Sequence, residues 1–241
     1  MAAALLVLLV LLAAGVALMA WGVRGRSSQW LGPVAWRGPR TRRAVALTFD
    51  DGPSESTPRL LELLDRYNVK ATFFMCGHHV RRLPHIVRQV AREGHEIANH
   101  SDTHEALYFR SPSFILEQIA RAQSSIHEVT GLAPRLFRPP LGVRWFGLSD
   151  ALTGLGLTCV MWTEIARDWT LDGAGVARRL ESRVAPGAIL CFHDGRDLRH
   201  NPDIGSTIEA LELLLPRWAG AGYEFLTVSE LLWQSTNSHS V

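Results

Sequence analysis

The chain has 241 residues and a formal net charge of +2, from 25 basic and 23 acidic residues. Six of the basic residues lie in the acid-free segment 24–43, which leaves 19 basic against 23 acidic residues elsewhere. Because the remainder is mildly acidic, the basic excess suits anionic lipid headgroups or a solvated linker, and it excludes a nucleic-acid-binding face. The six residues are Arg24, Arg26, Arg37, Arg40, Arg42 and Arg43.

Residues 1–23 are predicted to form a transmembrane anchor. Positions 2–23 carry no charge and are mostly Ala, Leu, Val and Met. As a helix rising about 1.5 Å per residue, this stretch can cross a hydrocarbon core of about 30 Å. No Lys or Arg precedes it, and its best small-residue exit, Gly15-Val16-Ala17, is a weak cleavage signal. These features favour an uncleaved anchor, with a cleaved signal peptide as the alternative.

After the basic linker 24–43, residues 44–232 have the length of a single domain, followed by a polar tail, 233–241. Short apolar runs alternate with amphipathic helical stretches, which predicts parallel strands joined by helical crossovers. We expect an α/β fold, a distorted parallel (β/α) barrel of about seven strands, with an open sheet as the competing topology. The expected strands are 44–49, 71–75, 95–99, 135–137, 157–162, 188–192 and 224–228.

Helix boundaries and cysteines follow local rules. Pro216 interrupts the last long helical stretch, so we expect a kink or break there. The three cysteines lie in apolar stretches without zinc-site spacing and are expected to be buried free thiols. Thr57-Pro58 is expected to start one helix, and Pro84 and Gly94 mark the two ends of another. Ser111-Pro112 and Gly131 mark the start and the end of a third helix. The three cysteines are Cys76, Cys159 and Cys191.

Chemically active side chains follow the first, third, fourth and sixth expected strands. They are Asp50 and Asp51, His100, Arg138 and His193. In a parallel barrel the carboxyl ends of the strands meet at one rim, where the active site lies. The sequence therefore predicts that these groups converge.

Five ordered motifs resemble those of the polysaccharide deacetylases, the NodB-homology group or carbohydrate esterase family four. The resemblance covers about residues 44–230. It implies a distorted (β/α) barrel and metal-dependent removal of acetyl groups from N-acetylated sugars. The motifs are Thr48-Phe49-Asp50-Asp51-Gly52-Pro53, His100-Ser101-Asp102-Thr103-His104, Arg138-Pro139-Pro140-Leu141-Gly142, Asp168-Trp169 and His193.

The expected metal ligands are Asp51, His100 and His104. The two histidines are four residues apart, which places both imidazoles on one face if the segment is helical. Two imidazoles and one carboxylate leave coordination positions open, as a catalytic divalent ion requires. Zinc is the most natural ion, and cobalt, nickel or iron would also accept this set.

By resemblance, Asp50 is the general base that deprotonates the attacking water. Arg138 is expected to hold Asp50 ionised and oriented. His193 is expected to donate a proton to the leaving nitrogen, with Asp168 raising its pKa and fixing its orientation.

Three residues are expected to contact the substrate: Pro139 and Leu141 of the third motif, with a backbone N–H near Leu141 for the oxyanion, and Trp169 as a groove wall. The sequence departs from the family pattern around them. Leu141 replaces a frequent Tyr, and Cys191 a frequent Leu. Ile165 stands where an Asp is usual, with Glu164 one place off register.

The predicted function is therefore N-deacetylation of N-acetylglucosamine-type glycans, such as peptidoglycan, another envelope polysaccharide or chitin-like oligomers. Two alternatives are an amidohydrolase of a small soluble amide and a non-catalytic glycan-binding module. The anchor argues against the first, and the complete motif set argues against the second. An envelope substrate places the domain outside the cytoplasmic membrane on a single-pass anchor, whereas the arginines after the anchor favour the opposite orientation. We rank the extracytoplasmic location first.

Overall fold

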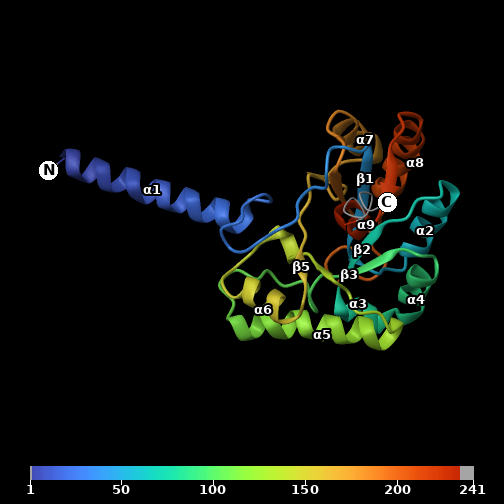
Figure 1. Ribbon diagram of the computed structural model, residues 1–241, viewed down its shortest axis with the longest axis horizontal. Coiled ribbons are helices and arrows are strands. Elements are labelled where there is room, and N and C mark those ends of the chain that lie inside the picture. Colours follow the sequence, from blue (N-terminus) through green and yellow to red (C-terminus); the bar gives the residue numbers. More distant parts are fainter. Residues whose placement is uncertain (1, 234–241) are drawn as a thin grey trace, which may run out of the picture.

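The computed structural model describes residues 2–233, so the expected polar tail lies outside the described residues except for Trp233. Its centre is one sheet in which every strand pair is parallel, in the order β5-β4-β3-β2-β1-β7-β6, with β8 paired to the start of β1. The sheet curls into a half-barrel (Figure 1). The strands are β1 Ala44–Gly52, β2 Thr72–Met75, β3 Glu96–Asn99, β4 Leu136–Phe137, β5 Thr158–Cys159, β6 Glu164–Ile165, β7 Ala188–His193 and β8 Glu224–Leu226.

The predicted parallel α/β barrel is confirmed, and all seven expected strands are present. The structure adds β6, which the sequence did not predict as a separate strand. Strands β5 and β6 stand at the two ends of the strand order, so the barrel is open between them.

The helices connect successive strands, and most of them cover the outer face of the sheet. Leu60, Leu64 and Leu211 pack there against outward-facing side chains such as Phe73 and Leu190. Burying a side chain of this size contributes about 1.5–3 kcal/mol. The helices are α1 Ala2–Arg24, α2 Thr57–Arg66, α3 Gly77–Arg82, α4 Pro84–Arg92, α5 Pro112–Thr130, the 3₁₀ turn Pro140–Gly142, α6 Leu148–Gly154, α7 Gly173–Glu181, α8 Gly205–Gly220 and α9 Val228–Trp233.

The helix-end signals act as predicted in α5. Ser111 Oγ accepts the backbone N–H of Phe114 at 3.2 Å, and Gly131 ends the helix in the left-handed conformation with φ 72°. Of the expected kink or break at Pro216, the break is wrong, because α8 continues for four residues beyond it. The three cysteines are buried and free, as expected.

Strand periodicity decides which residues face the barrel interior. Along β1, Val45, Leu47 and Phe49 belong to the outer core, whereas Ala44 and Ala46 belong to the inner cluster. Alternate residues of a strand share a face, so the inner row continues to the carboxyl end of β1 and presents Asp50 to the interior.

The segment 24–43 is packed on the domain and is not a free linker. The backbone N–H of Ala35 donates to the carbonyl oxygen of Cys159 at 2.9 Å, and Gly38 donates to Gly187 at 2.8 Å. Cys159 belongs to β5 and Gly187 immediately precedes β7. The segment therefore bridges the two sides of the barrel opening.

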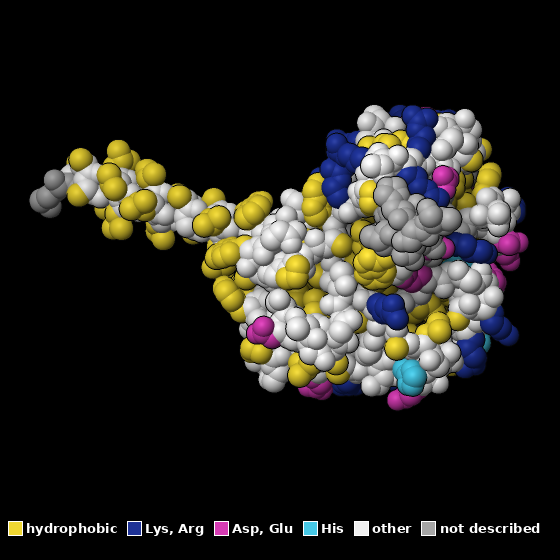
Figure 2. Space-filling model, in the orientation of Figure 1, with side chains coloured by type: hydrophobic (Ala, Val, Ile, Leu, Met, Phe, Trp, Pro, Cys, Tyr) yellow, Lys and Arg dark blue, Asp and Glu magenta, His cyan; other side chains and the backbone are white. Residues whose placement is uncertain are grey.

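Helix α1 projects from one side of the domain (Figure 1). It has a mean hydropathy of 2.9 in its most apolar window, and it is long and apolar enough to cross a membrane. No charged residue lies in positions 2–23, and Figure 2 shows hydrophobic side chains along the visible face of the helix. Residues 2–21 are exposed, and an exposed helix of this length without charged side chains suits a nonpolar environment, as a membrane anchor or a signal sequence would have.

Candidate active site

A cavity of about 860 Å³ lies at the carboxyl ends of the strands. Asp50 and Asp51 end β1, His100 follows β3 and His193 ends β7, and all four line the cavity. Asp50 and His193 are direct partners in the register of β1 and β7, so their side chains share the inner face. The predicted convergence at one rim is what the structure shows.

Arg138 binds Asp50 from behind the cavity. Its Nη1 donates to Asp50 Oδ1 at 2.6 Å and to Thr48 Oγ1 at 2.7 Å. Its Nε and Nη2 donate to the carbonyl oxygens of Val160 and Met161 at 3.3 and 3.2 Å. A fully buried guanidinium with these partners holds one carboxylate oxygen of Asp50 in place and supplies the opposite charge.

Cys191 lies against the other oxygen of Asp50, with Sγ 3.4 Å from Oδ2. Burial, reinforced by the charge of Asp50, raises the pKa of this thiol well above its usual value. Cys191 is therefore a neutral neighbour of the carboxylate, at the position where the family often has Leu.

Asp51, His100 and His104 form a compact cluster. Asp51 Oδ1 lies 3.4 Å from His100 Nε2 and 3.0 Å from His104 Nε2. His100 Nδ1 lies 2.7 Å from the carbonyl oxygen of Arg138, and His104 Nδ1 lies 3.0 Å from Asp197 Oδ1. Each imidazole is thus held through Nδ1, which directs Nε2 toward Asp51.

The segment between the two histidines is not helical, so a shared helix face is not what brings the imidazoles together. His100 leaves the end of β3 and His104 lies in a loop, where Ser101 and His104 have φ angles of 66° and 55°. These left-handed residues fold the chain back on itself, so the loop brings the two rings to a centroid distance of 5.0 Å.

His193 is bound by Asp168 at two points. Its Nδ1 lies 2.8 Å from Asp168 Oδ1, and its backbone N–H donates to Oδ2 at 2.8 Å. Thr207 Oγ1 also donates to Oδ2 at 2.6 Å. Burial alone would lower the pKa of His193, but the charge and hydrogen bond of Asp168 outweigh it and raise the pKa to about 9.

Of the three residues expected to contact the substrate, two line the cavity and one does not. Leu141 lines the cavity, 57% exposed, with φ 57°. Trp169 also lines it, and its ring packs edge-on against His193 at 5.0 Å. Pro139 is buried and is absent from the cavity lining, so this prediction has no geometric support.

Glu164 does not take the place of the Asp that the family usually has at the position of Ile165. Its carboxylate faces a group of guanidinium groups, those of Arg26, Arg179 and Arg183, at 3.8, 3.7 and 3.5 Å. Ile165 lines the cavity at this point. The cavity wall is therefore apolar where the family pattern has a carboxylate.

Two residues of the site were missed in the sequence. Asp197 holds His104 with its side chain, and its backbone N–H donates to Asp51 Oδ2 at 3.0 Å. Thr207, in the first turn of α8, fixes Asp168. A single polar residue in a loop or in the first turn of a helix belongs to no periodic pattern, so no sequence signal pointed to Thr207. For Asp197 the one available signal was its position four residues after His193.

The loop after His193 needs a glycine for close approach. A Cβ atom at Gly195 would lie 2.3 Å from the backbone oxygen of Asp51, which is shorter than any ordinary contact. Gly195 therefore lets the loop that carries Asp197 pack on the end of β1.

Comparisons with known proteins show the family of the chain. The polysaccharide deacetylase family model matches residues 37–160. A peptidoglycan-N-acetylglucosamine deacetylase of Bacillus cereus is 37% identical over 206 residues, which cover 83% of this chain and 93% of the relative. A chitooligosaccharide deacetylase of Bradyrhizobium sp. is 33% identical over 198 residues, covering 78% and 90%.

Among solved structures, a peptidoglycan N-acetylglucosamine deacetylase in complex with 4-naphthalen-1-yl-N-oxidanyl-benzamide superposes with a TM-score of 0.78. The two sequences are 29% identical, and the match covers 83% of this chain and 92% of that one. Sequence and fold therefore point to the same group of proteins.

Proposed function

The chain belongs to the polysaccharide deacetylase family and is a glycan deacetylase, and from this premise we propose that it is a metal-dependent enzyme that removes N-acetyl groups from N-acetylglucosamine-type glycans of the cell envelope. The observation that carries the proposal is the convergence of two sets on one cavity. Asp51, His100 and His104 offer ligands, while Asp50 and His193 offer a base and an acid.

The donor cluster fits a divalent ion. One ligand atom from each of Asp51, His100 and His104 lies within 4.8 Å of the other two. The acceptors on Nδ1 of both histidines are the outer contacts that orient ligating imidazoles. A second group, formed by Asp50, Cys191 and His193, also has its ligand atoms within 4.8 Å of one another. Arg138 already binds Asp50, however, and the positive charge of Arg138 opposes a cation there. Asp51, His100 and His104 are therefore the proposed ligands.

A divalent ion in this cluster would lower the pKa of a bound water and polarise the acetyl carbonyl; zinc suits the ligands, and cobalt, nickel or iron would also fit. Asp50, adjacent to the cluster and held by Arg138, accepts the proton of the attacking water. We assign stabilisation of the oxyanion to the backbone N–H of Leu141, a residue of the cavity wall.

His193 provides the proton that the departing nitrogen requires. An amide nitrogen leaves as an amine only after protonation, and the proton must be present at neutral pH. The pKa of about 9 keeps His193 protonated there. Asp168 and Thr207 fix the ring, and Trp169 packs on its edge at the cavity wall, where an aromatic face can stack on a sugar ring.

We further propose that α1 is retained as a single-pass anchor and that the domain lies outside the cytoplasmic membrane. The apolar surface of α1 supports the anchor, and the proposed envelope substrate supports the location. The buried contacts between its last turn and the domain also support it.

Acetate release from peptidoglycan, chitin oligomers and small acetamides, measured side by side with the full chain, tests the reaction class. We expect acetate from the glycans at a kcat/KM at least 100-fold above that for the small acetamides. Equal turnover of the small acetamides would contradict a glycan-specific site and favour a general amidohydrolase.

Metal removal tests the ligands. We expect His104→Ala to lose bound metal and activity while the fold persists, because one of three ligands is missing. His127→Ala, an exposed histidine on α5, is the matched control and should keep both. Chelation should abolish wild-type activity and added divalent ion should restore it; full activity with no metal by elemental analysis would contradict the proposal.

A further inference from the structure

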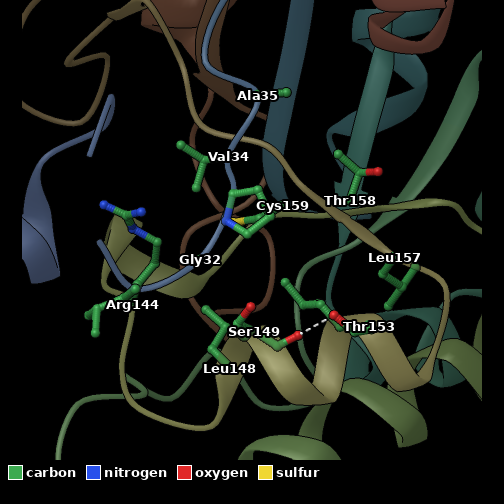
Figure 3. Close-up of a pocket in the computed structure, with 13 residues that line it drawn as sticks. Gly32, Val34, Ala35, Arg144, Leu148, Ser149, Thr153, Leu157, Thr158 and Cys159 are labelled. Carbon is green, nitrogen blue, oxygen red and sulfur yellow. Dashed lines mark hydrogen bonds between the residues drawn. The ribbon is translucent and has the colours of Figure 1, made fainter. Parts of the chain in front are cut away.

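The last turn of α1 is docked on the catalytic domain through Arg144. Arg144 is fully buried, and its backbone N–H donates to the carbonyl oxygen of Val23 at 3.0 Å. Its Nη1 donates to the carbonyl oxygen of Ser28 at 2.5 Å, and its Nη2 to those of Gly22 and Gly25 at 3.0 and 2.6 Å. Arg144 also lines a second, smaller cavity, and in Figure 3 its guanidinium group points away from that cavity.

Close packing of Gly22 against Trp30 adds to the contact between the end of α1 and the domain. Gly22 lies against the ring of Trp30, and a Cβ atom at Gly22 would approach that ring to 2.0 Å. Gly15, one to two turns earlier in α1, has open space around it. The helix end is therefore held by close contact, while the rest of the helix is exposed.

This docking places Arg24 in the wall of the catalytic cavity. Val23 and Gly25, on either side of it, both accept hydrogen bonds from Arg144. Arg144 itself follows Leu141 and Gly142, which line the same cavity. The residue that ends the anchor is thus part of the active site.

Arg24 belongs to a group of four arginines that line the cavity. The others are Arg167, Arg196 and Arg199. Within residues 2–233, none of the four forms an ion pair with a carboxylate, and Arg196 donates to the carbonyl oxygens of Asp168 and Gly195.

The four carboxylates of the cavity lining have partners other than these arginines. Asp50, Asp51 and Asp197 are each committed to Arg138 or to a histidine, as described above. Among the described lining residues, Asp203 is the remaining carboxylate, and it accepts the backbone N–H of Gly205 at 2.8 Å. The lining thus carries as many carboxylates as arginines, but within residues 2–233 none of these carboxylates forms an ion pair with Arg24, Arg167 or Arg199, whose guanidinium groups remain available to an acidic ligand.

We propose that Arg24, together with Arg167 and Arg199, binds an acidic group of a glycan presented at the membrane surface, so that the anchor forms part of the substrate site. This inference rests on the proposed function and narrows its substrate class to anionic, membrane-proximal glycans. Guanidinium groups pair with carboxylate and phosphate oxygens through directed hydrogen bonds. Because α1 ends at Arg24, with Trp21 half-exposed in its last turn, this part of the cavity lies at the lipid–water interface.

Kinetics of the full chain in nanodiscs of neutral phosphatidylcholine test the proposal. The substrates are a neutral N-acetylglucosamine oligomer, a glycan of equal length with free carboxylates, its methyl ester, and the neutral oligomer carrying a diphosphate at its reducing end. We expect the wild type to favour an acidic glycan over the neutral one at least tenfold in kcat/KM. Loss of the preference in the methyl ester would identify a carboxylate, and a preference for the diphosphate would identify a phosphate.

Arg24→Gln should lower this acidic-to-neutral ratio at least tenfold, mainly through KM, and Arg24→Lys should retain part of it because the charge remains. Arg40→Gln, in the same basic segment but outside the cavity lining, is the control and should leave the ratio within twofold. A wild-type ratio near one, or an unchanged ratio in Arg24→Gln, would overturn the inference while leaving glycan deacetylation intact. Absence of acetate release from every glycan would instead refute the proposed function, and this inference with it.

The docking itself is tested by Gly22→Val, whose side chain would meet Trp30, against Gly15→Val, whose side chain meets nothing. Gly22→Val is expected to reduce the acidic-to-neutral ratio as Arg24→Gln does, and Gly15→Val to keep the wild-type ratio. Equal ratios in the two glycine variants would show that the docked helix end does not form the acidic-group site.

Discussion

Asp50 and Asp51 are adjacent carboxylates with different partners, and this difference separates their expected roles. Arg138 holds Asp50, whereas two imidazoles surround Asp51. Asp50→Asn should keep the metal and lose turnover by about 10²–10⁴-fold, as expected for a missing general base. Asp51→Asn should weaken metal binding. Elemental analysis and kcat on the same preparations measure both effects, and release of the ion by Asp50→Asn alone would mean that the two roles are exchanged.

His193 gives the reaction an expected alkaline limit. The acid must be protonated to act, so with a pKa of about 9 we expect kcat/KM to fall above about pH 9. In Asp168→Asn the raising charge is gone and burial remains, so the pKa of His193 falls and the alkaline limb moves to lower pH by at least one unit. The control is Asp65→Asn, an exposed carboxylate on α2. A limb that stays in place in Asp168→Asn would exclude His193 as the acid.

At the scale of elements, α5 depends on its N-cap. Ser111 Oγ accepts the N–H of Phe114 at the start of the helix. Ser111→Ala should lower the free energy of unfolding by about 1 kcal/mol, the usual effect of losing such a cap. Ser124→Ala, at an exposed interior position of the same helix, should not destabilise, because Ala is the better helix former. Urea unfolding midpoints compare the two, and an equal midpoint for both variants would contradict the cap's contribution.

At the scale of the whole molecule, the position of the domain relative to the membrane is the main expectation. An envelope glycan requires residues 44–241 outside the cytoplasmic membrane, although the arginines after α1 favour the inside. A large domain can be translocated largely regardless of nearby charge. Reporter fusions after residue 241 should therefore be active as a periplasmic enzyme and silent as a cytoplasmic one. The reverse pattern would place the enzyme on the inner face and point to lipid-linked or soluble cytoplasmic substrates.

The sequence by itself determined the apolar N-terminal helix, the strand–helix alternation and the main members of the candidate site. These are local properties: periodicity decides the strand face, and Asp50 and His193 stand where apolar strands end. Parallel strands then bring these ends to one rim without any further information.

Only the tertiary structure decided contacts between residues far apart in the chain. Arg144 meets Ser28 across 116 positions, and Asp197 meets Asp51 across 146. The loop that carries His104 is folded back by left-handed residues, whereas the sequence spacing could place the two imidazoles together only on the condition of a helix. Such contacts depend on how packed surfaces meet, and no repeat in the sequence records them. For this reason the docking of α1, and the place of Arg24 in the cavity lining, became visible only in the fold.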